Sequence, residues 1–81
     1  MVRITSVRPL GGFQVELGFT DGSRRAVDLA PYLRGPVFQA IRDDPTVFQS
    51  VRVDPRLGTI VWPNGADLDP DVLFAGLEPT A

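Results

Sequence analysis

Hydrophobic and polar residues alternate most strictly between residues 13 and 20, where Phe13, Val15, Leu17 and Phe19 are separated by polar residues or glycine. This alternation predicts a β-strand with one buried and one solvated face. Shorter alternating or apolar runs predict four further strands, at residues 2–7, 24–29, 51–54 and 59–62. A Pro-Leu-Gly-Gly sequence at residues 9–12 is predicted to end the first of these strands.

The hydrophobic pattern also selects the turn that follows the strand at residues 13–19. A two-residue Asp-Gly turn would pair Glu16 with Val27 and mix polar and apolar side chains on both faces. A three-residue loop at residues 20–22 pairs Val15 with Val27 instead and keeps one face apolar. Because a slip of one residue inverts every side chain, we expect the three-residue loop, with Gly22 in the left-handed position of a type I turn plus bulge.

Residues 36–43 have the pattern of a short amphipathic helix. Pro36 suits the first helical position, and Val37, Phe38 and Ile41 are predicted to form its apolar face. Asp44 precedes a proline, which disfavours helical geometry and ends the helix there. The Asp44 side chain is also expected to cap a second short helical turn.

The C-terminal third predicts a second hairpin and a last helix. Pairing Val53 with Ile60 requires a four-residue loop at residues 55–58. Asp69 is a good N-cap, and Pro70 suits the first position of the helix that follows. The apolar stripe of this helix is predicted to consist of Val72, Leu73, Phe74 and Leu77.

The element order is therefore β-β-β-α-β-β-α, which predicts a single α+β domain over residues 1–81. Because hairpins dominate, we expect a largely antiparallel sheet of about five strands with the helices on one face. The predicted core is Phe13, Val15, Leu17, Val27, Leu29, Phe38, Ile41, Phe48, Val51, Val53, Ile60, Trp62, Leu73 and Phe74.

Composition removes several kinds of chemistry. The chain has no Cys and no His, which excludes thiolate ligands, a Cys nucleophile and a histidine general base. No apolar run is long enough to span a membrane, and the N-terminus lacks the pattern of a signal peptide, so a cytoplasmic protein is expected. All eight cations are Arg and the net charge is −2, which gives no overall attraction to nucleic acid.

The densest cluster of unusual residues runs from Trp62 to Asp71. Asp67, Asp69 and Asp71 alternate, and Glu78 lies where the last ligand of a calcium loop would be counted. The loop would need Gly where Val72 stands, so we expect no metal site and no cofactor here.

Other residues of this cluster have a structural and a functional interpretation. Asn64 and Gly65 predict a tight turn, with an anion-binding loop as the alternative. Asp67 either accepts backbone amides and fixes the loop or contacts a partner. Trp62 is expected in the core, and it becomes a binding centre if it is exposed. Arg56, on a nearby turn, completes the predicted partner-binding set: Arg56, Trp62, Asn64, Gly65 and Asp67.

The stretch Gly58-Thr59-Ile60-Val61-Trp62-Pro63-Asn64-Gly65-Ala66-Asp67-Leu68, with Phe19-Thr20-Asp21-Gly22 upstream and Pro70-Asp71 downstream, resembles a small bacterial family catalogued as domain of unknown function 2442. The resemblance covers nearly the whole chain. It implies an α+β fold, frequent pairing with a second small protein in toxin–antitoxin-like gene pairs, and no established catalytic residue. Some members carry an added helix-turn-helix domain, and this chain ends where that domain would begin.

The leading functional hypothesis is a non-enzymatic protein-interaction module, antitoxin-like or regulatory, whose partner is a small toxin-like protein. A small core would gain from a partner or from formation of a homodimer. The alternative is a nucleic-acid-binding regulator that uses the open sheet face and the Arg residues. A carboxylate-based, metal-dependent enzyme is the least favoured of the three.

Overall fold

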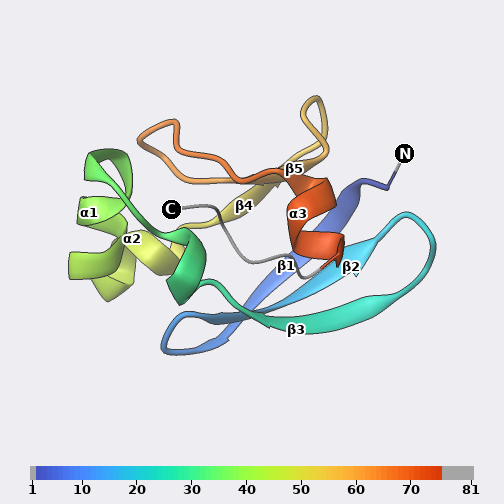
Figure 1. Cartoon of the computed structure of the whole chain (residues 1–81), viewed down its shortest axis with the longest axis horizontal. Helices are drawn as coiled ribbons and strands as arrows, with labels where there is room; N and C mark the ends of the chain where they lie inside the picture. Colours follow the sequence, from blue (N-terminus) through green and yellow to red (C-terminus); the bar gives the residue numbers. More distant parts are fainter. Residues whose placement is uncertain (1, 76–81) are drawn as a thin grey trace.

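The structure is a computed structural model that describes residues 2–75, and its five strands form two antiparallel sheets (Figure 1). One sheet has the order β1-β2-β3 and the other is the hairpin β4-β5. The α+β class and the antiparallel strands are confirmed, while the division into two sheets is a feature that local patterns do not reveal. The strands are β1 (Ile4–Gly11), β2 (Gln14–Phe19), β3 (Arg24–Asp28), β4 (Arg52–Asp54) and β5 (Thr59–Val61).

The helices are short, and the three α-helices of residues 2–75 lie in two separate places. The helical segments are η1 (Ala30–Tyr32), α1 (Pro36–Asp43), α2 (Pro45–Gln49) and α3 (Pro70–Ala75). Helices α1 and α2 pack together beyond one end of the three-stranded sheet, and α3 lies over it (Figure 1).

The hairpin β2–β3 has the register that the hydrophobic pattern predicts. Val15 lies opposite Val27, and the N–H and C=O of Phe19 bond to Ser23 and Gly22 across a three-residue loop, at 3.0 Å each. Gly22 has a φ of +87°, which an L side chain adopts only at a cost. The type I turn plus bulge is therefore confirmed.

Strand β1 corrects one prediction, because it continues through Pro9 to Gly11. Pro9 lies opposite Val15, whose backbone groups face β3, since the odd-numbered residues of β2 bond to that strand. The proline nitrogen therefore points away from β2, and no ladder hydrogen bond is lost. An edge strand tolerates proline at such a position.

The hairpin β4–β5 has the predicted four-residue loop, with Val53 opposite Ile60. This loop is held to the first sheet by residues at the start of the chain. Ile4 N–H donates to the Gly58 carbonyl at 2.8 Å. Arg3 Nη2 donates to the carbonyls of Pro55 at 2.9 Å and of Arg56 at 3.1 Å. We call this set of hydrogen bonds the Arg3 clasp.

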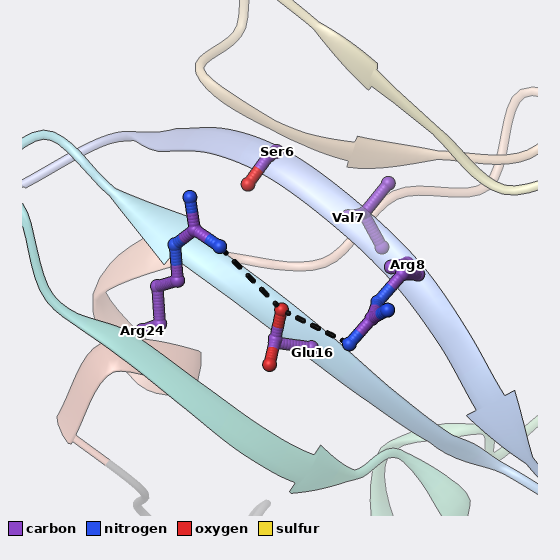
Figure 2. Close-up of a pocket in the computed structure, with 5 residues that line it drawn as sticks. All are labelled: Ser6, Val7, Arg8, Glu16 and Arg24. Carbon is purple, nitrogen blue, oxygen red and sulfur yellow. Dashed lines mark ion pairs between the residues drawn. The ribbon is translucent and has the colours of Figure 1, made fainter.

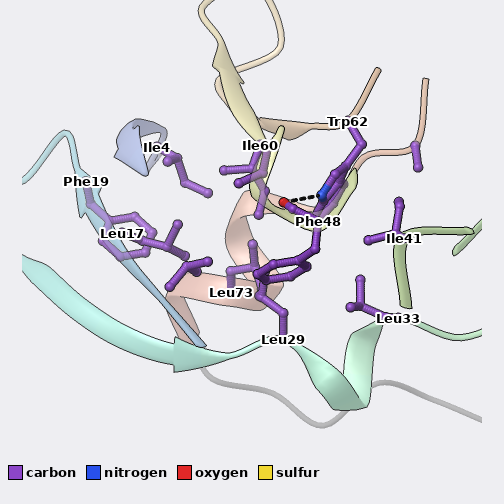
Figure 3. Packing of buried hydrophobic residues seen from close by; sticks show 13 residues of the cluster. Ile4, Leu17, Phe19, Leu29, Leu33, Ile41, Phe48, Ile60, Trp62 and Leu73 are labelled. Carbon is purple, nitrogen blue, oxygen red and sulfur yellow. Dashed lines mark hydrogen bonds between the residues drawn. The ribbon is translucent and has the colours of Figure 1, made fainter. Parts of the chain in front are cut away.

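The core lies between the two sheets and the helices (Figure 3). Trp62 is 1% exposed, and its indole N–H donates to the Phe48 carbonyl at 3.1 Å. Some predicted core residues are only partly buried, namely Phe13, Val27, Phe38, Val53 and Phe74. The structure adds buried residues that were not in the predicted core, namely Ile4, Phe19, Leu33, Val61 and Ala66.

The predicted helix caps are present, but the apolar face of α1 is narrower than expected. The side chains of Asp44 and Asp69 accept hydrogen bonds from the N–H groups of Thr46 and Asp71, at 2.9 Å each. Val37, predicted as part of the buried face of α1, is 50% exposed. Leu77, predicted on the stripe of α3, lies outside the described residues.

Candidate functional site

The turn after β5 repeats the geometry of the turn after β2. Trp62 N–H donates to the Ala66 carbonyl, and Gly65 N–H donates to the Trp62 carbonyl, at 2.9 Å each. These bonds enclose a three-residue loop in which Gly65 has a φ of +88°. The tight Asn64-Gly65 turn is therefore confirmed. It is again a type I turn with a left-handed glycine.

Asn64 uses both ends of its amide within the fold. Its Oδ1 accepts the N–H of Ala66 at 3.1 Å, and its Nδ2 donates to the carbonyl of Val37 at 2.9 Å. The first bond closes the turn and the second ties the loop to the start of α1. Asn64 is thus a positioning residue, so its mutation is expected to disturb the fold as well as any surface.

Val37 is the functional candidate that sequence reasoning missed. It precedes Ile41 by one helical turn, and this spacing suggested a shared buried face. In the structure Ile41 is fully buried and Val37 is half exposed, beside the loop that Asn64 holds. Asn64 thus ties a residue with an exposed apolar side chain to a fixed, exposed loop.

Trp62 does not belong to this surface. Its ring packs edge-to-face against Phe38, with centroids 6.2 Å apart, and its indole N–H bonds to the Phe48 carbonyl inside the core. The expectation of a core residue is confirmed. The partner-contact role, which required exposure, is wrong for this side chain.

Asp67 remains available to a partner. Its backbone forms an isolated antiparallel bridge with Val61, and its side chain is exposed. Within residues 2–75 its carboxylate makes no hydrogen bond or ion pair, so the predicted amide-accepting role is wrong. The backbone bridge and Asn64 fix the loop instead.

Arg56 lies away from the other predicted partner-binding residues. It belongs to the loop that precedes β5, whereas Asn64 and Gly65 belong to the loop that follows it. The two loops therefore stand at opposite ends of one strand (Figure 1). Closeness in sequence suggested a common surface, but an extended strand separates its two ends by roughly 10 Å over three residues.

The alternating aspartates do not converge. Asp69 caps α3, and Asp71 lies in the first turn of that helix, where a carboxylate is favourable to the helix dipole. Between residues 2 and 75 no group of three or more Asp or Glu residues has an arrangement that suits a metal ion. Glu78, the fourth residue of the calcium-loop comparison, lies outside the described part of the chain.

The outer face of the three-stranded sheet carries charge of both signs (Figure 2). Glu16 lies between two guanidinium groups, at 3.5 Å from Arg8 and 3.9 Å from Arg24. With Ser6 they line an open hollow of about 400 Å³. Because both arginines face the same carboxylate, their attraction for a phosphate backbone is reduced.

Comparison with known proteins gives one family. A family model described as "Protein of unknown function (DUF2442)" matches residues 4–79. No curated protein and no solved structure matches the chain. Over the described residues, none of the helices has the length and apolar character needed to cross a membrane.

Proposed function

We propose that this chain, which belongs to the DUF2442 family, is a non-enzymatic interaction module that binds another small protein. The binding site would be the loop–helix surface, which we define as Val37, Pro63, Asn64, Gly65 and Asp67. One observation carries the proposal: the half-exposed Val37 is held against an exposed loop by the Asn64 hydrogen bond. The resemblance to a family whose members often occur in antitoxin-like gene pairs supports a small, toxin-like partner.

The rigidity of its loop makes this surface suitable for binding. The loop is fixed by the turn bonds of Trp62 and by both ends of the Asn64 amide. A fixed loop loses little conformational entropy when a partner binds, so more of the contact energy appears as affinity. Asp67 adds a carboxylate that has no partner within residues 2–75, which gives a cationic group of the partner a specific contact.

The chain's composition supports binding rather than catalysis. It lacks Cys and His, which are the usual nucleophile and general base at neutral pH. The carboxylates near the loop either cap a helix or face solvent, and in these positions they do not act as a general acid and a general base.

Co-expression with the protein of the neighbouring gene, followed by light scattering and affinity measurement, tests the proposal. We expect a stable hetero-complex that Val37→Asp weakens at least about tenfold, because it replaces the exposed apolar side chain with a charged one. Leu57→Asp is the matched control, since Leu57 is equally exposed, at 51% against 50%, but lies on the loop before β5. It should bind as the wild type does.

Three results would overturn the proposal. The first is a wild-type protein that forms no complex with the neighbouring protein. The second is a Val37→Asp variant that remains folded by circular dichroism and binds with unchanged affinity. Equal losses in both aspartate variants would show that the loop–helix surface has no special role.

A further inference from the structure

Strand β3 is one of the two edge strands of the three-stranded sheet. The sheet order is β1-β2-β3, and among the described residues β3 pairs with β2 alone. In Figure 1 it runs along the lower rim of the molecule, on the side away from the loop at residues 63–65. The edge of such a strand offers a row of backbone donors and acceptors to another chain.

The hairpin register shows which groups face outward. Leu29 N–H bonds to the Phe13 carbonyl at 2.9 Å, so Leu29 and every second residue before it bond to β2. The intervening residues Arg24, Ala26 and Asp28 therefore turn their N–H and C=O groups toward the free edge. Their side chains share the outer face of the sheet.

We propose that a second copy of this chain pairs with β3 in antiparallel orientation, around a twofold axis at Ala26. The strand sequence Arg-Arg-Ala-Val-Asp carries opposite charges at its two ends. An antiparallel copy therefore places Arg24 opposite Asp28 of the second copy, once at each end of the pairing. All three outward-facing residues exchange hydrogen bonds, and each cross-strand pair of opposite charges adds stability.

Other registers are less favourable. An axis at Arg25 would place two Arg25 side chains directly opposite each other, and like charges in that position are destabilising. An axis at Val27 would place Arg24 opposite Ala30, which begins η1 and is no longer in the strand. The charges that usually protect an edge strand therefore select one self-complementary register here.

The core-side face next to this edge is hollowed, and both polar and apolar residues line it. A hollow of about 340 Å³ borders β3, and Val27, Tyr32 and Leu73 are among its lining residues. In the proposed pairing, Val27 of the second copy lies opposite Arg25, on the face that borders this hollow. The dimer would bury this edge and leave the loop–helix surface open.

Sedimentation velocity and light scattering over a range of protein concentrations test the dimer. We expect the wild type to dimerise, R24D and D28R to be monomeric, and an equimolar mixture of the two variants to dimerise again. In the mixture, each carboxylate at positions 24 and 28 of one chain faces a guanidinium of the other. Arg52→Asp, an exposed change on β4, is the matched control and should remain dimeric.

A second variant separates loss of the dimer from loss of the fold. Asp28 Oδ1 accepts the Ala30 N–H at 3.0 Å, so D28R also removes a local bond. Ala26→Pro removes an N–H that points away from β2, so the monomer should keep its circular dichroism and melting transition while the dimer is lost. A monomeric wild type at all concentrations, or a mixture that stays monomeric, would overturn the proposal.

This inference stands apart from the proposed function. Val37→Asp, which is designed to break the hetero-complex, should dimerise as the wild type does, because the twofold pairing does not use α1. A Val37→Asp variant that loses the dimer would show that the proposed edge pairing is wrong. A failure of the hetero-complex alone would leave the β3 pairing in place.

Discussion

The role of Asn64 yields a prediction that separates positioning from partner contact. Asn64→Ala removes both the bond to the Val37 carbonyl and the bond from the Ala66 N–H. A hydrogen bond contributes about 0.5–1.5 kcal/mol net, so the loss should be about 1–3 kcal/mol of unfolding free energy. For a domain of this size, each kcal/mol lowers Tm by roughly 4–8 °C.

Asn64→Asp is the matched variant. Asp21 stands at the same position of the first hairpin turn, where its carboxylate accepts the Ser23 N–H at 2.9 Å. An aspartate at position 64 should therefore keep the turn, but it removes the bond to Val37 and leaves a carboxylate oxygen near the Val37 carbonyl. The lost bond costs about 0.5–1.5 kcal/mol, and repulsion between the two oxygens adds to this cost.

Urea unfolding followed by Trp62 fluorescence measures both variants, because the indole is buried in the native state. Equal stability of the wild type and both variants would refute the positioning role. An Asn64→Asp variant as stable as the wild type, beside a weakened Asn64→Ala, would show that the bond to α1 contributes nothing.

Two further predictions concern the other hairpin loops. Gly22→Ala should lower the unfolding free energy measured in urea by about 1–2 kcal/mol, because alanine would have to adopt the left-handed conformation. Gly58→Ala should cost more, because a Cβ there would lie 2.6 Å from Arg3 Nε; equal losses would contradict this. Hydrogen bonds from the Ser23 side chain and backbone lower the pKa of Asp21 below its ordinary 3.8, so Ser23→Ala should raise it in a carboxyl NMR titration. Because the pKa of Asp21 is lower in the native state, its ionised carboxylate stabilises the fold above pH 3.8, and this contribution is lost as the pH falls through the native pKa. The difference in unfolding free energy between the wild type and Ser23→Ala should therefore shrink in acid.

Local sequence chemistry predicted the parts of the fold that local forces determine. The register of β2–β3 followed from the two-residue period of the strand, and the caps at Asp44 and Asp69 followed from their place before a proline. Each depends on residues close together in sequence. For this reason the tight turn at Asn64 and Gly65 was also predicted correctly.

Features that depend on distant contacts were not predictable in this way. The residue that covers Phe19 was one of these, because the Phe74 ring of α3 packs edge-to-face on it with centroids 5.0 Å apart. The exposure of Val37 depends on how α1 sits against the loop that holds Asn64. The separation of Arg56 from that loop follows from the path of β5, which sequence proximity conceals.

The Arg3 clasp has a consequence for the order in which the chain acquires its structure. Each hairpin closes a loop of a few residues, whereas Arg3 contacts carbonyls 52 and 53 residues away. Bringing the ends of such a long loop together costs more entropy and slows folding. The hairpins can pair locally, so the start of the chain must wait for the β4–β5 hairpin before it can dock.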